Sequence, residues 1–198
     1  MIKKNTKINK RGFTLMELLI VIGVLAILAT SATLVLNPAE LLKQARDSTR
    51  ISDLSTLNNA LSLYVTNVSS PDMDGSAGAA GTCAVNCFTH ISGTAANCGG
   101  RNVGASTSTP SRTVDNVGWI PVTFTDIPGG APLSNVPVDP TNSTSYFYSY
   151  ACDDTNETYE LDTVFESVKY LTTNDYDGKD GGNAAAVYEV GSDPGLDI

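Results

Sequence analysis

The sequence predicts an α+β fold in which a long N-terminal apolar helix is followed by an amphipathic helix that packs on a small antiparallel β-sheet. Three observations lead to this prediction. Residues 13–36 are mostly apolar and carry a single charge, Glu17. Residues 37–68 repeat apolar side chains every three or four positions, and the C-terminal part contains short alternating or aromatic-rich segments. A helical region followed by a run of strands is typical of the α+β class.

The apolar segment, residues 13–36, is long enough to cross a membrane, because a helix of this length extends about 36 Å at about 1.5 Å per residue. Five basic residues and no acidic residue precede it, namely Lys3, Lys4, Lys7, Lys10 and Arg11. A short basic flank favours the cytoplasmic side. We therefore expect a single pass through the inner membrane with a cytoplasmic N-terminus. A cleaved secretory signal ending near residues 29–32 is the alternative.

The charge balance limits the classes of partner. The chain has 198 residues and a net charge of −9. Without residues 1–12 it would contain seven basic and 21 acidic residues, a net charge of −14. Phosphate contacts require clustered Lys and Arg, so this balance argues against nucleic-acid binding through a basic patch. The chain therefore combines a basic tip, an apolar segment and an acidic body.

The second helix has a recognisable start. Asn37 is a suitable N-cap, Pro38 suits the first helical position, and Glu40 stands three residues after the cap. Pro38 also disfavours helix at Asn37, so we expect a kink or short break there. An apolar stripe follows at helical spacing: Leu54, Leu57, Leu61, Tyr64 and Val68. Polar residues are expected elsewhere on the surface: Asp47, Arg50, Asp53, Asn58 and Asn59.

Residues 69–118 are rich in Gly, Ala, Ser, Thr and Asn, which predicts a long surface loop in which a short helix or strand could be hidden. The four cysteines are Cys83, Cys87, Cys98 and Cys152. In an exported body they favour two disulfides, with three pairings open. A zinc site that includes Cys83 and Cys87 and a set of free thiols are the alternatives.

Four later segments carry strand signals: residues 118–124, 145–152, 158–167 and 184–190. Pro121 would restrict the first of them to a sheet edge. The third alternates between two faces, with Tyr159, Leu161, Thr163 and Phe165 on one and Glu160, Asp162, Val164 and Glu166 on the other. These segments predict a C-terminal antiparallel sheet.

Two stretches resemble the type IV pilin and pseudopilin family. Its N-terminal signature is a short basic leader ending in Gly, then Phe, Thr, Leu, a variable residue and Glu, before a long apolar helix. Here this signature stands as RGFTLMELLIV from Arg11 to Val21. The stretch VPVDPTNSTSYFYSY, residues 136–150, resembles the Pro-x-Asp-Pro and Tyr region of the major pseudopilins of type II secretion.

The resemblance implies a role for each residue of the motif. Gly12 would be the last leader residue, and a prepilin peptidase would cut the Gly12–Phe13 bond and methylate the new amine of Phe13. Glu17 would be the fifth residue of the mature chain and would pair with the N-terminal amine of a neighbouring subunit. The parts would be a leader (1–12), a membrane and filament-core helix (13–36), an amphipathic helix (37–68) and a head (69–198) that contains the loop 69–118.

The resemblance also implies partners. They would be the prepilin peptidase, an assembly ATPase, an inner-membrane platform protein, membrane lipid and other pilin subunits, in an extracellular or periplasmic filament. A pseudopilin of a type II secretion system and a membrane-anchored binding domain that never polymerises are the alternatives. No catalytic constellation is expected, because His90 is the only histidine and no nucleophile elbow or triad is present.

One acidic loop is a candidate calcium site. Asp175, Asp177 and Asp180 lie among glycines in NDYDGKDGG, residues 174–182, and such oxygens can hold Ca²⁺. Their spacing is not that of an EF-hand, and the residues alone favour a solvated acidic turn. Major pseudopilins often carry a calcium loop near the C-terminus, so the resemblance implies Ca²⁺ as the cofactor, if there is one.

Overall fold

A computed structural model describes residues 12–75, 83–102 and 104–198. The chain divides into two compact units, residues 1–41 and residues 42–198. The first contains α1, Leu15–Leu36. Its stretch Leu15–Thr33 is long and apolar enough to cross a membrane by length and composition, and none of this stretch is buried within the protein. The predicted apolar helix is therefore present.

The chain breaks between α1 and the helix α2, Pro38–Asn67. Asn37 lies in the left-handed region, with φ 40° and ψ 76°. Proline disfavours the α conformation at the preceding residue, and asparagine tolerates the left-handed one. The Asn37 carbonyl oxygen accepts hydrogen bonds from the backbone N–H of Glu40 at 3.0 Å and of Leu41 at 3.3 Å. The predicted break at Asn37–Pro38 is confirmed. Gly23, a residue with low helix propensity, nevertheless lies inside an uninterrupted α1.

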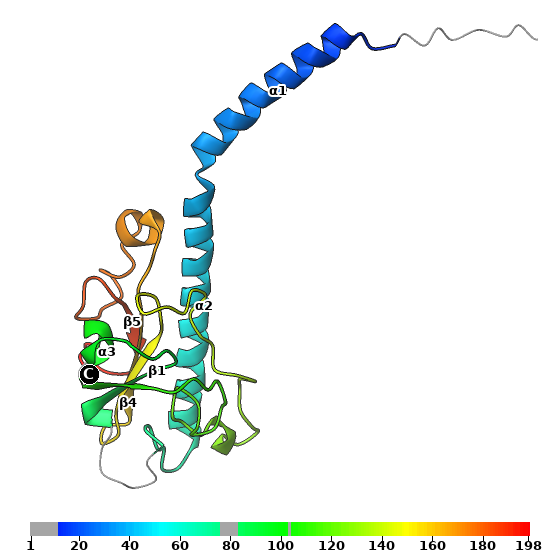
Figure 1. Ribbon diagram of the computed structural model, residues 1–198. Helices are drawn as coiled ribbons and strands as arrows, with labels where there is room; N and C mark the ends of the chain where they lie inside the picture. Colours follow the sequence, from blue (N-terminus) through cyan, green and yellow to red (C-terminus); the bar gives the residue numbers. More distant parts are fainter. Residues whose placement is uncertain (1–11, 76–82, 103) are drawn as a thin grey trace, which may run out of the picture. The chain divides into compact units, whose positions relative to one another are not determined.

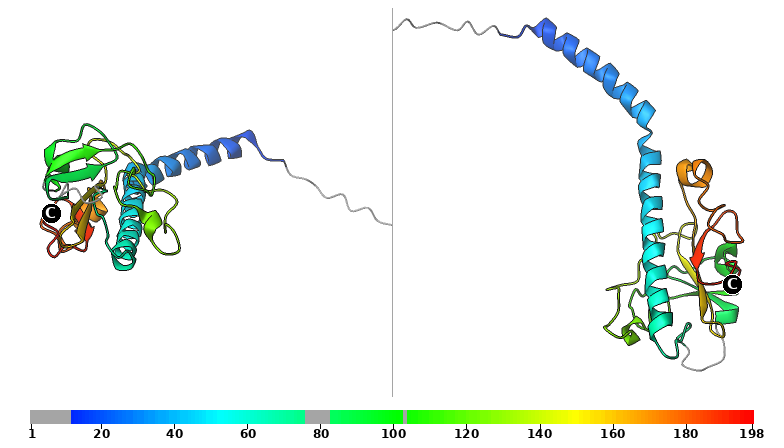
Figure 2. Two further views of the ribbon diagram at one scale, coloured as in Figure 1. Left: turned by 90° about the horizontal axis from the view of Figure 1, so that it is seen from below. Right: turned by 180° about the vertical axis from the view of Figure 1, so that it is seen from behind.

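The second unit contains a five-stranded mixed sheet with the order β2-β1-β3-β4-β5. The strands are β1 (Asn86–Thr89), β2 (Ala105–Ser108), β3 (Ser149–Asp153), β4 (Thr158–Thr163) and β5 (Tyr188–Gly191). β1 and β2 are parallel, and the other neighbours are antiparallel. Short helical elements connect them: η1 (Cys83–Val85), α3 (Ala96–Gly100), η2 (Phe124–Asp126) and η3 (Lys169–Thr173). Figure 1 and both views in Figure 2 show α2 beside this sheet.

α2 covers one face of the sheet, and its predicted apolar stripe forms the contact. Leu54, Leu57, Leu61 and Tyr64 are at most 1% exposed and belong to one core cluster with Tyr150 of β3 and Leu161 of β4. Burying one such side chain contributes about 1.5–3 kcal/mol. Because successive strand residues point to opposite faces, this contact fixes which residues of β3 and β4 face α2. The α+β fold class is confirmed.

The other face of the sheet is also buried. Cys87, Cys98, Phe147 and Ala151 form a second cluster there, and α3 contributes Cys98. As a consequence both alternating faces of β4 are buried, including Glu160 and Asp162. The acidic side chains Glu160 and Asp162, which alternate with apolar ones along β4, are therefore not exposed to solvent.

Two predictions about the head differ from the structure. The prediction of a strand at residues 118–124 is wrong: this stretch has no strand, and Phe124 starts η2. Its apolar side chains Trp119, Ile120, Val122 and Phe124 are nevertheless at most 1% exposed. The stretch thus contributes side chains to the core without pairing with a strand through backbone hydrogen bonds. Pro121 disfavours such pairing because it has no backbone N–H to donate. The expected loop 69–118 contains β1, α3 and β2 in its described part.

Candidate functional site

The predicted processing site lies directly before α1. Gly12 and Phe13 are exposed and outside regular structure, and a side chain added at Gly12 would meet nothing within 4 Å. Thr14 is the N-cap in extended backbone conformation, with φ −82° and ψ 151°. The Gly12–Phe13 bond therefore lies in an exposed, non-helical segment, and a peptidase can reach a peptide bond in such a segment.

Glu17 is held by a capping box at the start of α1. Its carboxylate Oε2 accepts hydrogen bonds from the Thr14 backbone N–H at 2.9 Å and from the Thr14 hydroxyl at 2.8 Å. In return, the Glu17 N–H donates to Thr14 Oγ1 at 3.2 Å. A carboxylate near a helix N-terminus also interacts favourably with the helix dipole. These contacts offset part of the cost of placing Glu17 in an apolar segment, about 2.5–3.5 kcal/mol at mid-membrane.

A buried ion network joins α2 to the rest of the head. The Arg50 guanidinium contacts carboxylate oxygens of Asp47, Asp139 and Glu166, each at 2.6 Å, and the side chains of Arg50, Asp47 and Asp139 are 0% exposed. The prediction that Asp47 and Arg50 lie on the surface is therefore wrong. Charges can be buried here because each has an opposite charge as partner.

The carboxylate of Glu166 accepts hydrogen bonds from two arginine side chains. Arg46 donates to its two carboxylate oxygens at 2.9 and 2.5 Å, and Arg50 donates to Oε1. The hydrogen bonds from Arg46, followed by those from Arg50, lower the pKa of Glu166 to about 2. The backbone N–H groups of Glu166 and Ser167 donate to Asp47. The chain after β4 is thereby fixed to α2.

The stretch 136–150 contributes several side chains to the contact with α2, among them Asp139, Tyr146 and Tyr148. Asp139 pairs with Arg50, and its Oδ1 also accepts from the backbone N–H of Thr141 at 2.7 Å. The Tyr148 hydroxyl donates to Asp53 at 2.9 Å, and the pKa of Asp53 is raised by burial. The resemblance identified this stretch, but sequence reasoning did not identify its partners on α2. The roles observed here are structural.

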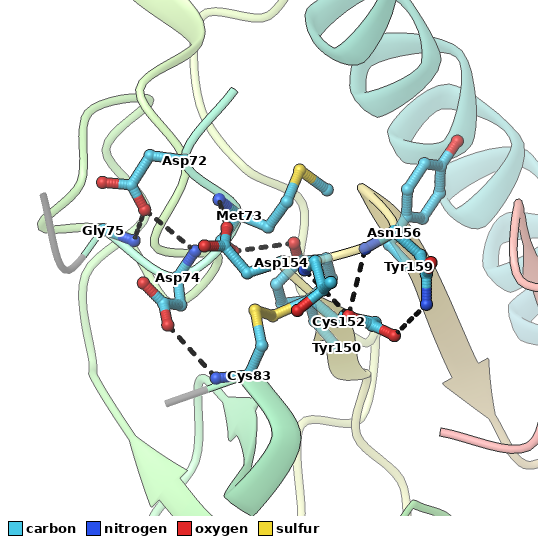
Figure 3. The surroundings of a disulfide bond; sticks show 12 residues. Asp72, Met73, Asp74, Gly75, Cys83, Tyr150, Cys152, Asp154, Asn156 and Tyr159 are labelled. Carbon is cyan, nitrogen blue, oxygen red and sulfur yellow. Dashed lines mark hydrogen bonds between the residues drawn. A yellow bond between two sulfur atoms is a disulfide. The ribbon is translucent and has the colours of Figure 1, made fainter. Parts of the chain in front are cut away.

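The four cysteines form two disulfides, Cys83–Cys152 and Cys87–Cys98. The expectation of disulfides is confirmed, and a zinc site has no thiol available because no cysteine is free. Figure 3 shows Cys83–Cys152 beside the segment 72–75, where the Cys83 N–H donates to Asp74 at 3.1 Å and the Met73 N–H to Asp154 at 3.0 Å. This disulfide therefore ties β3 to the chain that follows α2.

The three aspartates of the candidate calcium loop have different surroundings. Asp175 is half-exposed with Lys179 Nζ at 3.5 Å, Asp177 is buried, and Asp180 accepts from the backbone N–H groups of Gly182 and Glu189. They do not form a compact ligand set in the described part of the chain. Calcium binding by this loop stays a prediction.

A different acidic set is compact. Among the described residues, Glu160, Asp162 and Glu189 are the one group of three or more His, Cys, Asp or Glu with ligand atoms all within 4.8 Å of one another. Burial raises the pKa values of Glu160 and Asp162 above their ordinary range and raises that of Glu189 to about 7. Sequence reasoning missed this set. The alternation of acidic and apolar residues along β4 was the available signal.

Comparison with known proteins gave one match. Residues 7–33 match the family model of the prokaryotic N-terminal methylation motif. No curated protein and no solved structure matches the chain. The matched region contains the processing site, Glu17 and most of α1. Together with the long apolar helix and the α+β fold that follows it, this match supports the resemblance of the chain to the type IV pilin and pseudopilin family.

Proposed function

We propose that this protein is the structural subunit of a type IV pilus-like filament. It is anchored in the inner membrane by α1 with its N-terminus cytoplasmic, cut by a prepilin peptidase between Gly12 and Phe13, and methylated on the new Phe13 amine. The observation that carries the proposal is the methylation motif at residues 7–33, with an exposed Gly12–Phe13 segment and a carboxylate at the start of an apolar helix.

Glu17 would act as the assembly residue. In the part of the separate chain that the structure describes, its carboxylate accepts hydrogen bonds from Thr14, through donors at 2.8 and 2.9 Å. A charged amine from a neighbouring subunit would provide an ion pair, and pairing relieves much of the cost of a charge in apolar surroundings. Such a pair would also set the axial offset between subunits, as a buried polar residue sets register in a coiled coil.

The apolar helices supply cohesion in this proposal. Side chains of α1 such as Leu18, Leu25 and Leu28 are between 57 and 59% exposed in the separate chain. In a filament these helices would pack on one another, which replaces lipid contacts with helix contacts and removes apolar surface from water. An assembly ATPase and an inner-membrane platform protein would move each subunit out of the membrane, and the acidic heads would form the filament surface.

Two variants test the proposal in a cell that assembles the filament. Gly12→Leu should stay uncleaved, because the residue before the cut must be small, whereas Glu17→Ala should be cleaved and methylated but should give at least about ten-fold fewer filaments, the effect of about 1.4 kcal/mol per subunit addition. Mass spectrometry of the N-terminus and quantification of sheared filaments are the measurements. Glu40→Ala, which removes a carboxylate outside the apolar segment, is the control. Normal filaments from both test variants would contradict the proposal.

A pseudopilin of a type II secretion system is the second candidate, favoured by the stretch 136–150 and its Asp139. It would share the same processing but form a short periplasmic filament. A membrane-anchored binding domain that never polymerises would instead retain Met1. The mature N-terminus separates these classes: N-methyl-Phe13 supports a pilin or pseudopilin, and an intact leader supports the anchored domain.

A further inference from the structure

Three buried carboxylates meet on the face of the sheet that is turned away from α2. Glu160 and Asp162 belong to β4 and Glu189 to β5, where Asp162 and Glu189 are direct cross-strand partners. They are 1, 0 and 2% exposed, and one ligand oxygen of each lies within 4.8 Å of the other two. Three carboxylates this close and this buried repel one another, so something positive must compensate them.

Each carboxylate is oriented by protein donors on one of its oxygens. Asp162 Oδ2 accepts from Ser149 Oγ at 3.0 Å, Glu189 Oε2 from the Ala184 N–H at 2.9 Å, and Glu160 Oε2 from the Ile198 N–H at 3.2 Å. The remaining oxygens Asp162 Oδ1 and Glu189 Oε1 are buried and have no hydrogen-bond partner in the protein. The donors thus fix the carboxylates, and the two remaining oxygens can be satisfied by a proton of the neighbouring Glu160 carboxyl or by a cation.

Asn102 brings a buried side-chain amide beside the group. Its side-chain Nδ2 donates to Asp162 Oδ2 at 2.5 Å, which places the amide at the cluster. Asn102 is 6% exposed, and its Oδ1 has no partner in the protein. A buried amide oxygen is rarely left unsatisfied. Carboxylate oxygens together with a side-chain carbonyl are the donor set that Ca²⁺ prefers.

The buried cation Arg101 offsets only part of the charge of the cluster. The Arg101 guanidinium attracts Asp162 electrostatically, but it donates its hydrogen bonds to the backbone carbonyls of Phe147 and Ser145 and lies over the Phe147 ring at 3.6 Å. With all three carboxylates ionised, the cluster and Arg101 together would carry two negative charges. One divalent cation would cancel them.

We propose that Glu160, Asp162, Glu189 and the Asn102 carbonyl oxygen form a binding site for one divalent cation of the calcium class. Oxygens on opposite sides of a Ca²⁺ ion lie at most about 5 Å apart, since each is about 2.3–2.6 Å from the metal. The 4.8 Å span of the three carboxylates fits one such ion. The ion would join β4 and β5 to the segment that contains Asn102. This site is separate from the loop of Asp175, Asp177 and Asp180 and does not depend on filament assembly.

The test uses the full-length chain in detergent, stripped of metal with a chelator. Thermal unfolding is followed by the fluorescence of Trp119, the single tryptophan, which is 1% exposed. CaCl₂ is added to a concentration about one hundred times Kd and compared with NaCl of equal ionic strength. We expect CaCl₂, but not NaCl, to raise Tm by roughly 5–10 °C. Elemental analysis should find one bound ion per chain.

Three variants locate the ion. Asp162→Asn and Glu189→Gln should abolish the rise in Tm with Ca²⁺, whereas Asp175→Asn, in the acidic loop, should retain it. Asp115→Asn removes an exposed carboxylate elsewhere and should also retain it. Should Asp162→Asn fail to fold, Glu189→Gln and the metal content of the wild-type chain decide the outcome.

Several results would overturn the proposal. One is a wild-type chain that binds neither Ca²⁺ nor Mg²⁺ nor Mn²⁺ and is stabilised only by lowering the pH, which would mean that protons alone compensate the carboxylates. Another is a rise in Tm that survives in Glu189→Gln, or one that Asp175→Asn abolishes, which would place the ion in the acidic loop.

Discussion

Arg50 is the residue at which separate segments of the head converge. Arg50 belongs to α2, Asp139 to the stretch before β3, and Glu166 to the chain after β4. The Arg50 guanidinium lies 2.6 Å from a carboxylate oxygen of each of the other two. It also lies over the Tyr146 ring at 5.1 Å. A buried ion pair contributes little net stability compared with apolar packing, but removal of one partner leaves the others buried and unpaired. Arg50 is therefore expected to be much less tolerant of substitution than its neighbour Arg46.

Arg50→Ala should lower the free energy of unfolding by about 3–5 kcal/mol, because Asp47 and Asp139 would remain buried without a cation. Arg46→Ala is the matched control. The Arg46 side chain is 33% exposed, and Glu166 would still pair with Arg50, so the expected loss is at most about 1 kcal/mol. Denaturant unfolding of the full-length chain in detergent, followed by Trp119 fluorescence, measures both. Equal losses in the two variants would show that the network does not depend on Arg50.

At the scale of elements, the disulfides connect segments that contribute few ladder hydrogen bonds of their own. Cys83–Cys152 links η1 to β3 across 69 residues and belongs to the core cluster on the α2 side. Cys87–Cys98 links β1 to α3 across 11 residues and belongs to the cluster on the opposite side. β1 has only four residues and β2 likewise. Covalent links on both faces hold this short-stranded edge of the sheet.

The two disulfides should differ in their contribution to stability. Restricting the unfolded chain contributes about 4 kcal/mol for the loop closed by Cys83–Cys152 and about 3 kcal/mol for the one closed by Cys87–Cys98, because the entropy term grows with loop length. The double variant Cys83→Ala with Cys152→Ala should therefore lose about 1–2 kcal/mol more than Cys87→Ala with Cys98→Ala. Denaturant unfolding under non-reducing conditions measures the difference. The reverse order would mean that native packing around Cys98 outweighs the loop entropy.

At the scale of the whole molecule, charge and apolar surface are separated along the sequence. α1 contains one charged residue, Glu17, whereas the chain after residue 12 carries seven basic and 21 acidic residues. In the proposed filament, attraction would come from the apolar helices, and the acidic heads would repel one another. This separation determines how salt and detergent should affect the stability of the proposed filament.

Purified filaments should resist salt and dissociate in detergent. About 1 M NaCl reduces the screening length to about 3 Å, which weakens repulsion between heads and leaves apolar contacts intact. A mild detergent should release subunits, because it supplies an alternative apolar environment for α1. Sedimentation before and after each treatment is the measurement, with filaments in low-salt buffer as the control. Dissociation by salt alone would show that ion pairs between heads hold the filament together.

The sequence allowed the prediction of those features that depend on local order along the chain. The apolar α1, the break at Asn37–Pro38, the α2 stripe of Leu54, Leu57, Leu61 and Tyr64, and the C-terminal strands all follow from periodicity, capping and proline geometry. Residues 118–124 show where this reasoning fails. Their apolar, β-prone side chains satisfy the core without a strand, because Pro121 and tertiary packing outweigh β-propensity.

Consecutive residues encode the long apolar helix, the motif around Gly12 and Phe13, and the position of Glu17, so each of these could be predicted without a structure. Three features became known only from the folded chain: the pairing of the cysteines, the burial of Arg50 with Asp47 and Asp139, and the cluster of Glu160, Asp162 and Glu189 beside Asn102. The physical reason is that most of these partners lie far apart along the chain: Arg50 and Asp139 are 89 positions apart, and Cys83 and Cys152 are 69 apart. For the carboxylates it is also the second covered face of the sheet. Burial on both sides turns polar residues of β4 inward, and the pairs they form join residues from 13 to 60 positions apart.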